Sequence, residues 1–442
     1  MNRKVIFWAS IALLLFYGAW YGYARLPIIN GYASKMMCSC VFVSERSPED
    51  ILATDLNFSL IKYASPEVDY DRKTVTSTVW GLGAETSVYQ EGLGCTLVAD
   101  SKQPPALEQA ISVWPDRPDT LMWPVGDFLG RGKPYPALKK VMDKAFQKEK
   151  KTRAVLVTRG DELIWEQYAE GFDENTRLLG WSMTKSITSA LIGILVGDGQ
   201  LDIHAPAPVA DWQSDQRKNI TLNHLLQMSS GLDWVEDYGD ISSATTMLYA
   251  SSDMGKFASN VPLAHKPGRV WYYSSGTSNI LTKIIYETLG DQRAYYQFAR
   301  KRLFNPCGMR SMVLEPDASG NFVGSSYSFA TTRDWARFGL LYLNDGIFNG
   351  ERILPEGWVD YSRQAAKSAD GEYGAQWWLN ESLHFLPDCP ADVYFADGFQ
   401  GQRVWVIPSH DLVVVRLGLS SGEDFDFNEF LSGVLKAVAQ DN

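Results

Sequence analysis

One stretch, residues 178–201, constrains the fold of this chain more than any other. It reads LLGWSMTKSITSALIGILVGDGQL and contains a Ser-x-x-Lys tetrad, from Ser182 to Lys185. An apolar run without charges, residues 187–196, follows the tetrad and is typical of a buried helix. Residues three apart lie on the same face of a helix, so the Ser182 hydroxyl and the Lys185 amine are predicted to meet.

The tetrad predicts a serine nucleophile with a lysine base. A serine hydroxyl is a weak nucleophile unless a base lies within hydrogen-bond reach. Lysine can be that base when burial keeps its amine partly neutral, and the apolar helix after Lys185 would bury it. Backbone N–H groups at the helix start would stabilise an oxyanion beside Ser182. The alternative is structural, with Ser182 as the capping residue of a core helix.

A second Ser-x-x-Lys tetrad, from Ser59 to Lys62, lies in a different context. Its segment, NFSLIKYASP, is short and is interrupted by Pro66, and no long apolar run follows it. We therefore expect a solvated strand at Ser59 and no catalytic role.

Charge and motif content exclude several classes of function. The 442 residues carry a net charge of −11, whereas a face that binds nucleic acid needs a basic excess. The chain has no Gly-x-Ser-x-Gly elbow, no Walker or dinucleotide-binding loop, and no metal-binding spacing among its five histidines. We expect neither a cofactor nor a metal, and the sequence leaves the oligomeric state open.

The first 25 residues predict a membrane anchor. Arg3 and Lys4 precede residues 5–24, which carry no charge and are long enough to span a bilayer as one helix. Basic residues on that side favour a cytoplasmic N-terminus, which predicts a single-pass inner-membrane protein with a periplasmic catalytic domain. A cleaved signal peptide is the alternative, and the protein would then be secreted.

The five cysteines agree with export. An odd count leaves one thiol free and allows two disulfides at most. We expect Cys95 to bond either Cys38 or Cys40, and a second bond between Cys307 and Cys389. Their spacing fits no structural zinc site, and the alternative is a set of small, buried, reduced core residues.

Three regions are expected along the chain: the anchor at 1–25, an accessory segment at 26–122 and a catalytic domain at 123–442. In the accessory segment, residues 74–80 alternate as a strand does, and residues 87–98 could pair with them. Several prolines between positions 104 and 124 indicate a linker or an extended wrap.

The catalytic domain is expected to hold an antiparallel sheet with flanking helices and a helical part. A helix at 135–150 precedes a hairpin whose turn is Gly160-Asp161. After a mostly helical middle, two strands and a closing helix are expected at 404–407, 412–417 and 429–439. This order predicts an α/β (α+β) fold with a cleft between the sheet and the helical part.

Two further constellations could contribute to a site. Residues 273–276, Tyr-Ser-Ser-Gly, place a phenol and two hydroxyls before a helix, and Tyr273 could relay a proton if its pKa is lowered. Residues 396–404, ADGFQGQRV, place glycines before a strand, where a backbone N–H is free to bind an oxyanion. The structural alternatives are an ordinary aromatic residue and a glycine turn.

Taken together, the motifs resemble a known superfamily. WSMTKS, YSSG and the Gly-x-x-Gly-Gln of residues 398–402 occur in the order and spacing of serine β-lactamases and penicillin-binding proteins, on the class C-like side. More closely still, the chain is similar to 6-aminohexanoate-dimer hydrolases and related serine hydrolases in DGQLDIHAP, ITLNHLLQMSSGLDW, NPCGM, GSSYSFATTRDWARFG and LPEGW. The resemblance covers residues 123–417 and implies a β-lactamase-like fold.

The resemblance also implies roles for individual residues. Ser182 would be the acylated nucleophile, Lys185 its base and Tyr273 a proton relay. The backbone N–H groups of Ser182 and of Gln402, which follows Gly401, would form the oxyanion hole. Such a site would cleave a small ester or amide through an acyl-enzyme.

The sequence departs from the superfamily at two positions. Ser275 stands where the third residue of Tyr-x-Asn usually contacts substrate through an amide. Phe399 stands where Lys or His commonly binds the carboxylate of a β-lactam, and whether Arg403 supplies that charge is left open. The sequence therefore predicts a serine esterase or amidase. The alternatives are a penicillin-binding DD-peptidase or β-lactamase-like protein, and a non-catalytic envelope binding protein.

Overall fold

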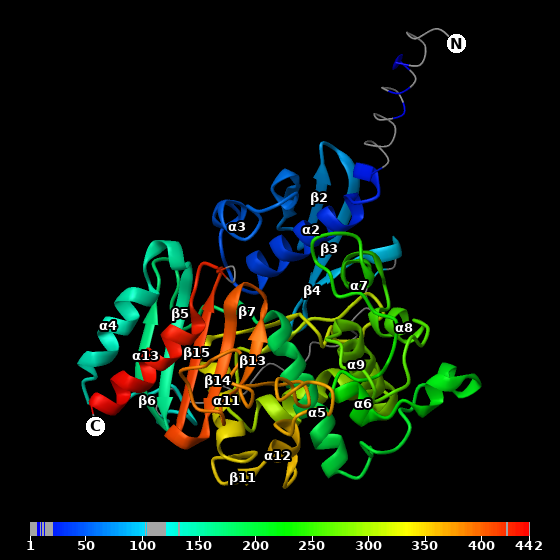
Figure 1. Ribbon diagram of the computed structural model, residues 1–442. Coiled ribbons are helices and arrows are strands. Elements are labelled where there is room, and N and C mark those ends of the chain that lie inside the picture. Colours follow the sequence, from blue (N-terminus) through cyan, green and yellow to red (C-terminus); the bar gives the residue numbers. More distant parts are fainter. Residues whose placement is uncertain are drawn as a thin grey trace.

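A computed structural model describes most of the chain as a large sheet, a helical region and an N-terminal segment (Figure 1). The described residues are 7–8, 10, 13, 21–101, 103, 121–130, 133–420 and 423–441. Most of the linker expected between positions 104 and 124, residues 104–120, lies outside them.

A six-stranded antiparallel sheet forms one side of the molecule (Figure 1). In sheet order its strands are β12 (Trp378–Leu379), β13 (Tyr394–Gly398), β14 (Gln402–Ile407), β15 (Leu412–Gly418), β5 (Thr152–Arg159) and β6 (Glu162–Tyr168). β5 and β6 form the expected hairpin around Gly160, and β15 pairs with β5. Strands from the two ends of the catalytic region therefore lie side by side.

Helices cover both faces of this sheet. Successive side chains of a strand point to opposite faces, and β5 follows this rule with Val155 and Val157 on one side and Ala154 and Leu156 on the other. The first pair packs with α4 (Pro136–Ala145) and α13 (Phe427–Gln440), and α11 (Thr332–Leu343) packs on the opposite face. Burial on both faces explains why the central strands are continuously apolar.

The helical region contains the buried helix that the tetrad predicts. α5 (Thr184–Gly197) buries every side chain from residue 184 to 195 and packs against α9 (Ser275–Leu289). Figure 1 shows it between the large sheet and the other helices. The remaining helices are α6 (Leu222–Leu226), α7 (Ser243–Ala250), α8 (Met254–Ser259), α10 (Gln292–Ala299) and α12 (Trp358–Ser362).

Two small sheets complete the catalytic region. The first has the order β7-β9-β8, and its strand β9 lies beside the segment that leads into the tetrad. The second is a two-stranded hairpin. Their strands are β7 (Leu178–Leu179), β8 (Val313–Leu314), β9 (Ser328–Ala330), β10 (Ile347–Phe348) and β11 (Glu351–Arg352).

The N-terminal segment places a long helix, α2 (Leu26–Phe42), on a four-stranded antiparallel sheet. The expected pairing within this segment is present, but the second run divides into two strands at a turn. In order, the strands are β1 (Ser65–Asp69), β2 (Thr74–Val79), β3 (Leu82–Gln90) and β4 (Gly94–Leu97), and a short helix, α3 (Pro48–Ala53), precedes them.

α2 packs directly against the catalytic region. A Cβ on Gly31 would lie 2.8 Å from the carbonyl oxygen of Tyr249 in α7, so only glycine allows the two helices to approach this closely. The buried side chains of α2 belong to the same hydrophobic core as those of α5 and α9. The N-terminal segment is therefore joined to the helical region through a continuous core.

The cysteine predictions have different outcomes. Cys38 of α2 and Cys95 of β4 form a disulfide, which confirms one of the two pairings expected of Cys95. The predicted bond between Cys307 and Cys389 is wrong, because both are free thiols buried in different hydrophobic clusters. Cys40 is also a free, buried thiol.

The predicted single-pass inner-membrane location, with a membrane-anchoring helix and a periplasmic catalytic domain, is contradicted. Within the described part of the chain, no helix is both long enough and apolar enough to cross a bilayer. Most of residues 5–24, on which the prediction rested, lie outside the described residues. α2, which begins at residue 26, has 17 residues and carries a buried lysine, Lys35, so its composition suits the protein interior.

The strand expected at Ser59 is also absent from the structure. Ser59 is exposed in a turn, with a φ of 45°, ahead of a short 3-10 helix, Ile61–Tyr63.

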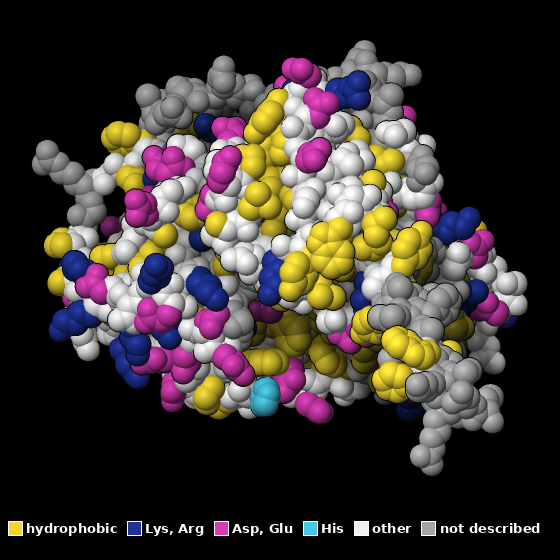
Figure 2. Space-filling model, turned by 90° about the horizontal axis from the view of Figure 1, so that it is seen from above, with side chains coloured by type: hydrophobic (Ala, Val, Ile, Leu, Met, Phe, Trp, Pro, Cys, Tyr) yellow, Lys and Arg dark blue, Asp and Glu magenta, His cyan; other side chains and the backbone are white. Residues whose placement is uncertain are grey.

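Large hydrophobic side chains of the N-terminal segment reach solvent, including Trp80, which is 81% exposed, and Leu82. Figure 2 looks down on this side of the molecule and shows hydrophobic side chains gathered among scattered charged ones.

Candidate active site

The tetrad brings its two functional side chains together. Ser182 lies in a single 3-10 turn, Trp181–Met183, and Lys185 lies in the first turn of α5. Lys185 Nζ is 3.0 Å from Ser182 Oγ, which confirms the contact that the spacing predicts. Lys185 is 1% exposed, whereas Ser182 is partly exposed. A molecule in the site could therefore reach the hydroxyl while the amine stays protected from water.

The turn before α5 is held in an unusual conformation. Trp181 has a φ of 47°, a left-handed value that costs a non-glycine residue free energy. The Thr184 hydroxyl donates to the Trp181 carbonyl oxygen at 2.6 Å, and the ring of Tyr32 in α2 stacks on the indole. The N-terminal segment thus supports the residue that precedes Ser182.

The surroundings of Lys185 favour the neutral amine. Burial lowers the pKa of Lys185 to about 8, against the opposing effect of the carboxylates of Glu236 and Asp397. A lysine with this pKa is partly neutral near physiological pH, as a base must be. The expectation that burial activates Lys185 therefore agrees with its environment.

Tyr273 lies against both members of the pair. Its ring is 4.7 Å from Lys185 Nζ, and its hydroxyl hydrogen-bonds the Ser182 side chain. Burial raises the pKa of Tyr273 well above its ordinary value, and the nearby Tyr373 adds to the effect. The lowered pKa that the sequence interpretation required is therefore not found, and Tyr273 stays protonated.

Ser275 connects the site to a loop that the sequence analysis did not identify. Its Oγ lies 3.0 Å from Lys185 Nζ and 2.5 Å from a carboxylate oxygen of Glu236. The same carboxylate accepts the Ser275 N–H at 2.8 Å and the Trp234 Nε1–H at 2.5 Å. Tyr238, from the same loop, lies 2.9 Å from Ser275 Oγ and donates to Glu236 at 2.7 Å. The only sequence signal was the acidic, aromatic composition of WVEDYGD.

The turn between β13 and β14 closes the opposite side of the site. Gly398 packs so closely on the carbonyl oxygen of Gly180 that a Cβ would lie 2.2 Å from it. Gly401 has a φ of 80°, which glycine adopts without strain. The Gln402 amide braces the turn by donating to the Gly418 carbonyl oxygen and accepting its N–H. This packing brings the segment that contains the Gln402 backbone N–H next to the tetrad.

The position that commonly carries a cation is apolar here. Phe399 is 51% exposed, and its ring meets the Trp181 ring edge to face at 5.7 Å. Arg403 does not supply the charge, because it donates to Asp397 at 2.6 Å and lies over the Phe427 ring. Asp397 therefore offsets the charge of Arg403, so Arg403 does not replace the missing cation beside Ser182.

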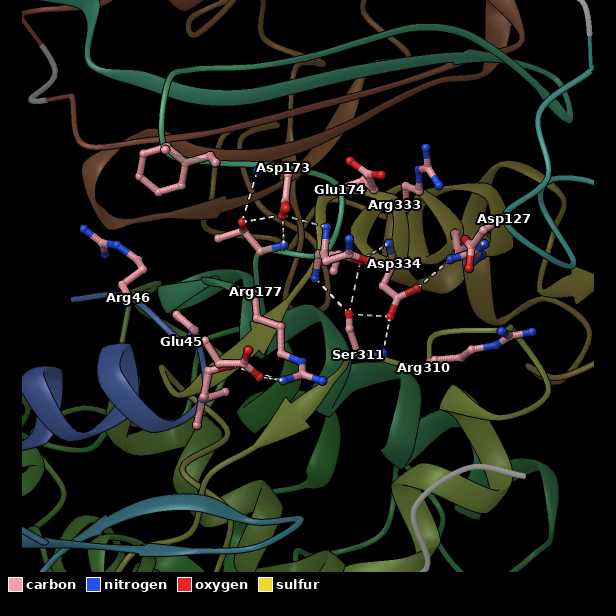
Figure 3. Close-up of a pocket in the computed structure, with 18 of the residues that line it drawn as sticks. Glu45, Arg46, Asp127, Asp173, Glu174, Arg177, Arg310, Ser311, Arg333 and Asp334 are labelled. Carbon is pink, nitrogen blue, oxygen red and sulfur yellow. Dashed lines mark hydrogen bonds and ion pairs between the residues drawn. The ribbon is translucent and has the colours of Figure 1, made fainter. Parts of the chain in front are cut away.

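A large cavity in the described structure lies away from this cluster. It has a volume of about 1030 Å³ and lies between the N-terminal segment and the start of α11. Figure 3 shows charged side chains from several elements pointing into it. Most are paired, as in Arg337 with Asp334 and Asp127 at 2.7 and 2.6 Å. Ser182, Lys185 and Tyr273 do not line it.

The residues predicted for a site therefore divide into two groups. Lys185 is in direct contact with Ser182, Tyr273 and Ser275, so these four form one cluster. Phe399, Gly401 and Gln402 approach the cluster through Trp181 and Gly180. Among the described residues, no group of His, Cys, Asp and Glu side chains is placed to hold a metal ion.

Comparisons with known proteins agree with this arrangement. The sequence profile of the Beta-lactamase family matches residues 141–430. A relative named 6-aminohexanoate-dimer hydrolase, from Paenarthrobacter ureafaciens, is 27% identical over 323 residues, which is 65% of this chain and 78% of the relative.

Two solved structures share the fold at low sequence identity. A family VIII carboxylesterase is 14% identical, with a TM-score of 0.55, and the match covers 71% of this chain and 99% of that one. A penicillin-binding protein homologue from Caulobacter crescentus gives the same identity, coverage and TM-score. At this identity the likeness concerns the fold.

Proposed function

Because the chain belongs to the beta-lactamase family and is a serine hydrolase acting on ester or amide bonds, we propose that it forms an acyl-enzyme on Ser182. The observation that carries the proposal is the 3.0 Å contact between Ser182 Oγ and the amine of Lys185. Burial keeps that amine partly neutral, since it lowers the pKa of Lys185 to about 8.

In the proposed acylation step, Lys185 takes the proton of Ser182 while Ser182 Oγ attacks the substrate carbonyl carbon. The backbone N–H groups of Ser182 and Gln402 would stabilise the oxyanion. Collapse of the intermediate breaks the bond to the leaving alcohol or amine, which receives a proton through Tyr273. That proton comes from Lys185: because its pKa is raised, Tyr273 stays protonated and gives up its own proton only as it takes the one that Lys185 received from Ser182. Water then releases the acid and restores Ser182.

The substrate we propose is a small, neutral or weakly polar ester or amide. Phe399 and the Trp181 ring supply apolar surface beside Ser182, and the nearby Arg403 is neutralised by Asp397. The names of two similar proteins, a 6-aminohexanoate-dimer hydrolase and a carboxylesterase, support an amide or ester bond as the target.

We also propose that residues 26–122 are an accessory segment and residues 123–442 the catalytic domain. The family match begins at residue 141, which leaves the N-terminal helix and its sheet outside it. The contact between Tyr32 and Trp181 suggests that this segment supports the site rather than acting separately.

Labelling with a fluorophosphonate, followed by intact-mass analysis and peptide mapping, tests the proposal. We expect one adduct, on Ser182, and none in Ser182→Ala. Ser59→Ala is the matched control, because it removes the serine of the other tetrad, and its labelling should equal that of the wild type. Labelling at another residue, or none with an active preparation, would overturn the assignment.

A further inference from the structure

The Lys185 amine has three neighbours that differ in what they offer it. Its Nζ lies 3.0 Å from Ser182 Oγ, from Ser275 Oγ and from the carbonyl oxygen of Ser325. A protonated lysine has three N–H donors and can satisfy all three neighbours. A neutral amine has two N–H donors and one lone pair. The neighbour that faces the lone pair therefore decides whether Lys185 can act as a base.

Two of the neighbours can be assigned as acceptors. The Ser325 carbonyl oxygen has no proton to donate, so it accepts an N–H from Lys185. The Ser275 hydroxyl has a single proton, and its Oγ lies 2.5 Å from Glu236 Oε1. A carboxylate accepts only, so this proton goes to Glu236. Ser275 Oγ must then accept the second N–H of Lys185.

Glu236 is itself held in place for this task. Its Oε2 accepts the Ser275 N–H at 2.8 Å and the Trp234 Nε1–H at 2.5 Å. Its Oε1 accepts the Tyr238 hydroxyl at 2.7 Å in addition to that of Ser275. Trp234 is buried, and the Ser275 N–H lies at the start of α9. The carboxylate therefore has little freedom to turn away from Ser275.

We propose that Glu236 is a positioning residue for the base. By accepting the Ser275 proton, it makes Ser275 an acceptor toward Lys185, so that the lone pair of the neutral amine faces the Ser182 hydroxyl. The inference rests on the proposed function, in which Lys185 is the base for Ser182, and it assigns a role to a loop residue 39 positions from Ser275.

The same carboxylate acts on the charge of Lys185. The charged and titratable groups that face the amine are Glu236, Asp397 and the phenol of Tyr273, with the Tyr238 phenol beyond Ser275. Both carboxylates raise the pKa of Lys185 and so oppose the effect of burial. Removing the charge of Glu236 should therefore lower the pKa of Lys185 further.

Glu236→Gln tests the proposal, with p-nitrophenyl butyrate as substrate. The amide can donate to Ser275 Oγ, and the Ser275 proton is then free to take the Lys185 lone pair. We expect kcat to fall about ten- to one-hundredfold, part of what a positioned base supplies, with little change in KM. The acid limb of the pH–rate profile should move to lower pH. Glu236→Asp should recover part of the rate.

Asp237→Asn is the matched control, since it removes one negative charge from the same loop at an exposed side chain that bonds the Gly239 N–H. It should leave kcat and the pH profile unchanged. A purely structural role for Glu236 predicts a lower rate at every pH without movement of the acid limb, and that outcome would overturn the proposal.

Ser275→Ala provides an independent test that leaves the carboxylate in place. It should lower kcat to a similar extent, and Glu236→Gln should add little in the Ser275→Ala background, because both changes break one connection. Losses that add in full, or a Ser275→Ala variant with the wild-type kcat, would contradict the proposal. If the wild type is not labelled at Ser182, the proposed function fails instead, so the two failures are distinguishable.

Discussion

Lys35 and Lys185 are two buried lysines that each hydrogen-bond a serine hydroxyl. Lys35 Nζ lies 2.9 Å from Ser39 Oγ, and Lys185 Nζ lies 3.0 Å from Ser182 Oγ. Both lysines are 1% exposed, and burial lowers the pKa of both. The sites differ in the placement of a carboxylate. Glu315 contacts Lys35 directly, whereas the Ser275 hydroxyl separates Glu236 from Lys185.

The position of the carboxylate explains why we propose Lys185, and not Lys35, as a base. A carboxylate in direct contact stabilises the ammonium form, and Glu315 also accepts the Ser39 hydroxyl proton at 2.9 Å. The serine, the lysine and the carboxylate are all buried, so the arrangement links α2 to the residue after β8. In the Lys185 site the carboxylate acts through a hydroxyl, and the serine beyond the amine is partly exposed. A lysine, a serine and a carboxylate can thus form a buried ion pair at one site and, as we propose, activate a serine nucleophile at the other.

The first prediction concerns Ser182 and Lys185, whose loss should lower activity more than any other change. Ser182→Ala and Lys185→Ala should each lower kcat/KM at least about one-thousandfold, and the double variant should be no worse, because the two residues act as a unit. Hydrolysis of p-nitrophenyl butyrate measures this, with Ser59→Ala as the control at wild-type rate. Full activity in Ser182→Ala would contradict the assignment.

The second prediction concerns stability. Lys35→Met leaves Glu315 buried without its partner and should lower the free energy of unfolding by about 3–5 kcal/mol. Adding Glu315→Gln removes the charge, keeps an acceptor for the Cys95 N–H, and should restore much of the loss. Urea denaturation measures both, and the folded variants should hydrolyse substrate at the wild-type rate. Loss of turnover in Lys35→Met without a loss of stability would contradict the structural role of Lys35.

The features predictable from the sequence are those set by short-range spacing. Ser182 and Lys185 meet because they lie three residues apart, and the β5–β6 hairpin follows from Gly160-Asp161 between two apolar runs. The buried helix after Lys185 follows from residues 187–196, which are mostly apolar and carry no charge. In each case one local pattern has one favourable structure.

The features missed depend on contacts between distant residues. Glu236 reaches Ser275 across 39 positions, and Glu315 reaches Lys35 across 280. Nothing in the short apolar-flanked segment around Ser59 distinguishes a strand from a turn. The Ser325 carbonyl oxygen that receives a Lys185 N–H belongs to the backbone, so no residue type could have revealed it. Tertiary packing alone decides these contacts.

The third prediction concerns the choice of substrate. A β-lactam carboxylate would meet Phe399 rather than a cation, and a missing charge-assisted hydrogen bond costs about 1.5–3 kcal/mol, or roughly ten- to more than one-hundredfold in rate. Short-chain p-nitrophenyl esters should therefore be cleaved much faster than nitrocefin. Phe399→Lys should narrow the gap, and Phe399→Leu, which stays neutral, should not. Equal kcat/KM for nitrocefin and p-nitrophenyl butyrate in the wild type would refute this prediction.

The last prediction concerns the pH dependence of kcat/KM, which should depend on Lys185 and not on Lys35. In the proposed mechanism, acylation needs the neutral form of Lys185, whose pKa burial lowers to about 8. Below that pH the neutral fraction falls about tenfold per pH unit, so at pH 7 kcat/KM should be about one tenth of its plateau. The rate should rise through pH 8 and then level off. The rate can be followed at the isosbestic wavelength of p-nitrophenol, where the ionisation of the product does not contribute.

The Lys35→Met/Glu315→Gln variant should keep the same acid limb, because Lys35 takes no part in the proposed reaction. A profile that is flat from pH 6 to 9, or a limb that moves with Lys35, would show that the titrating base is not Lys185.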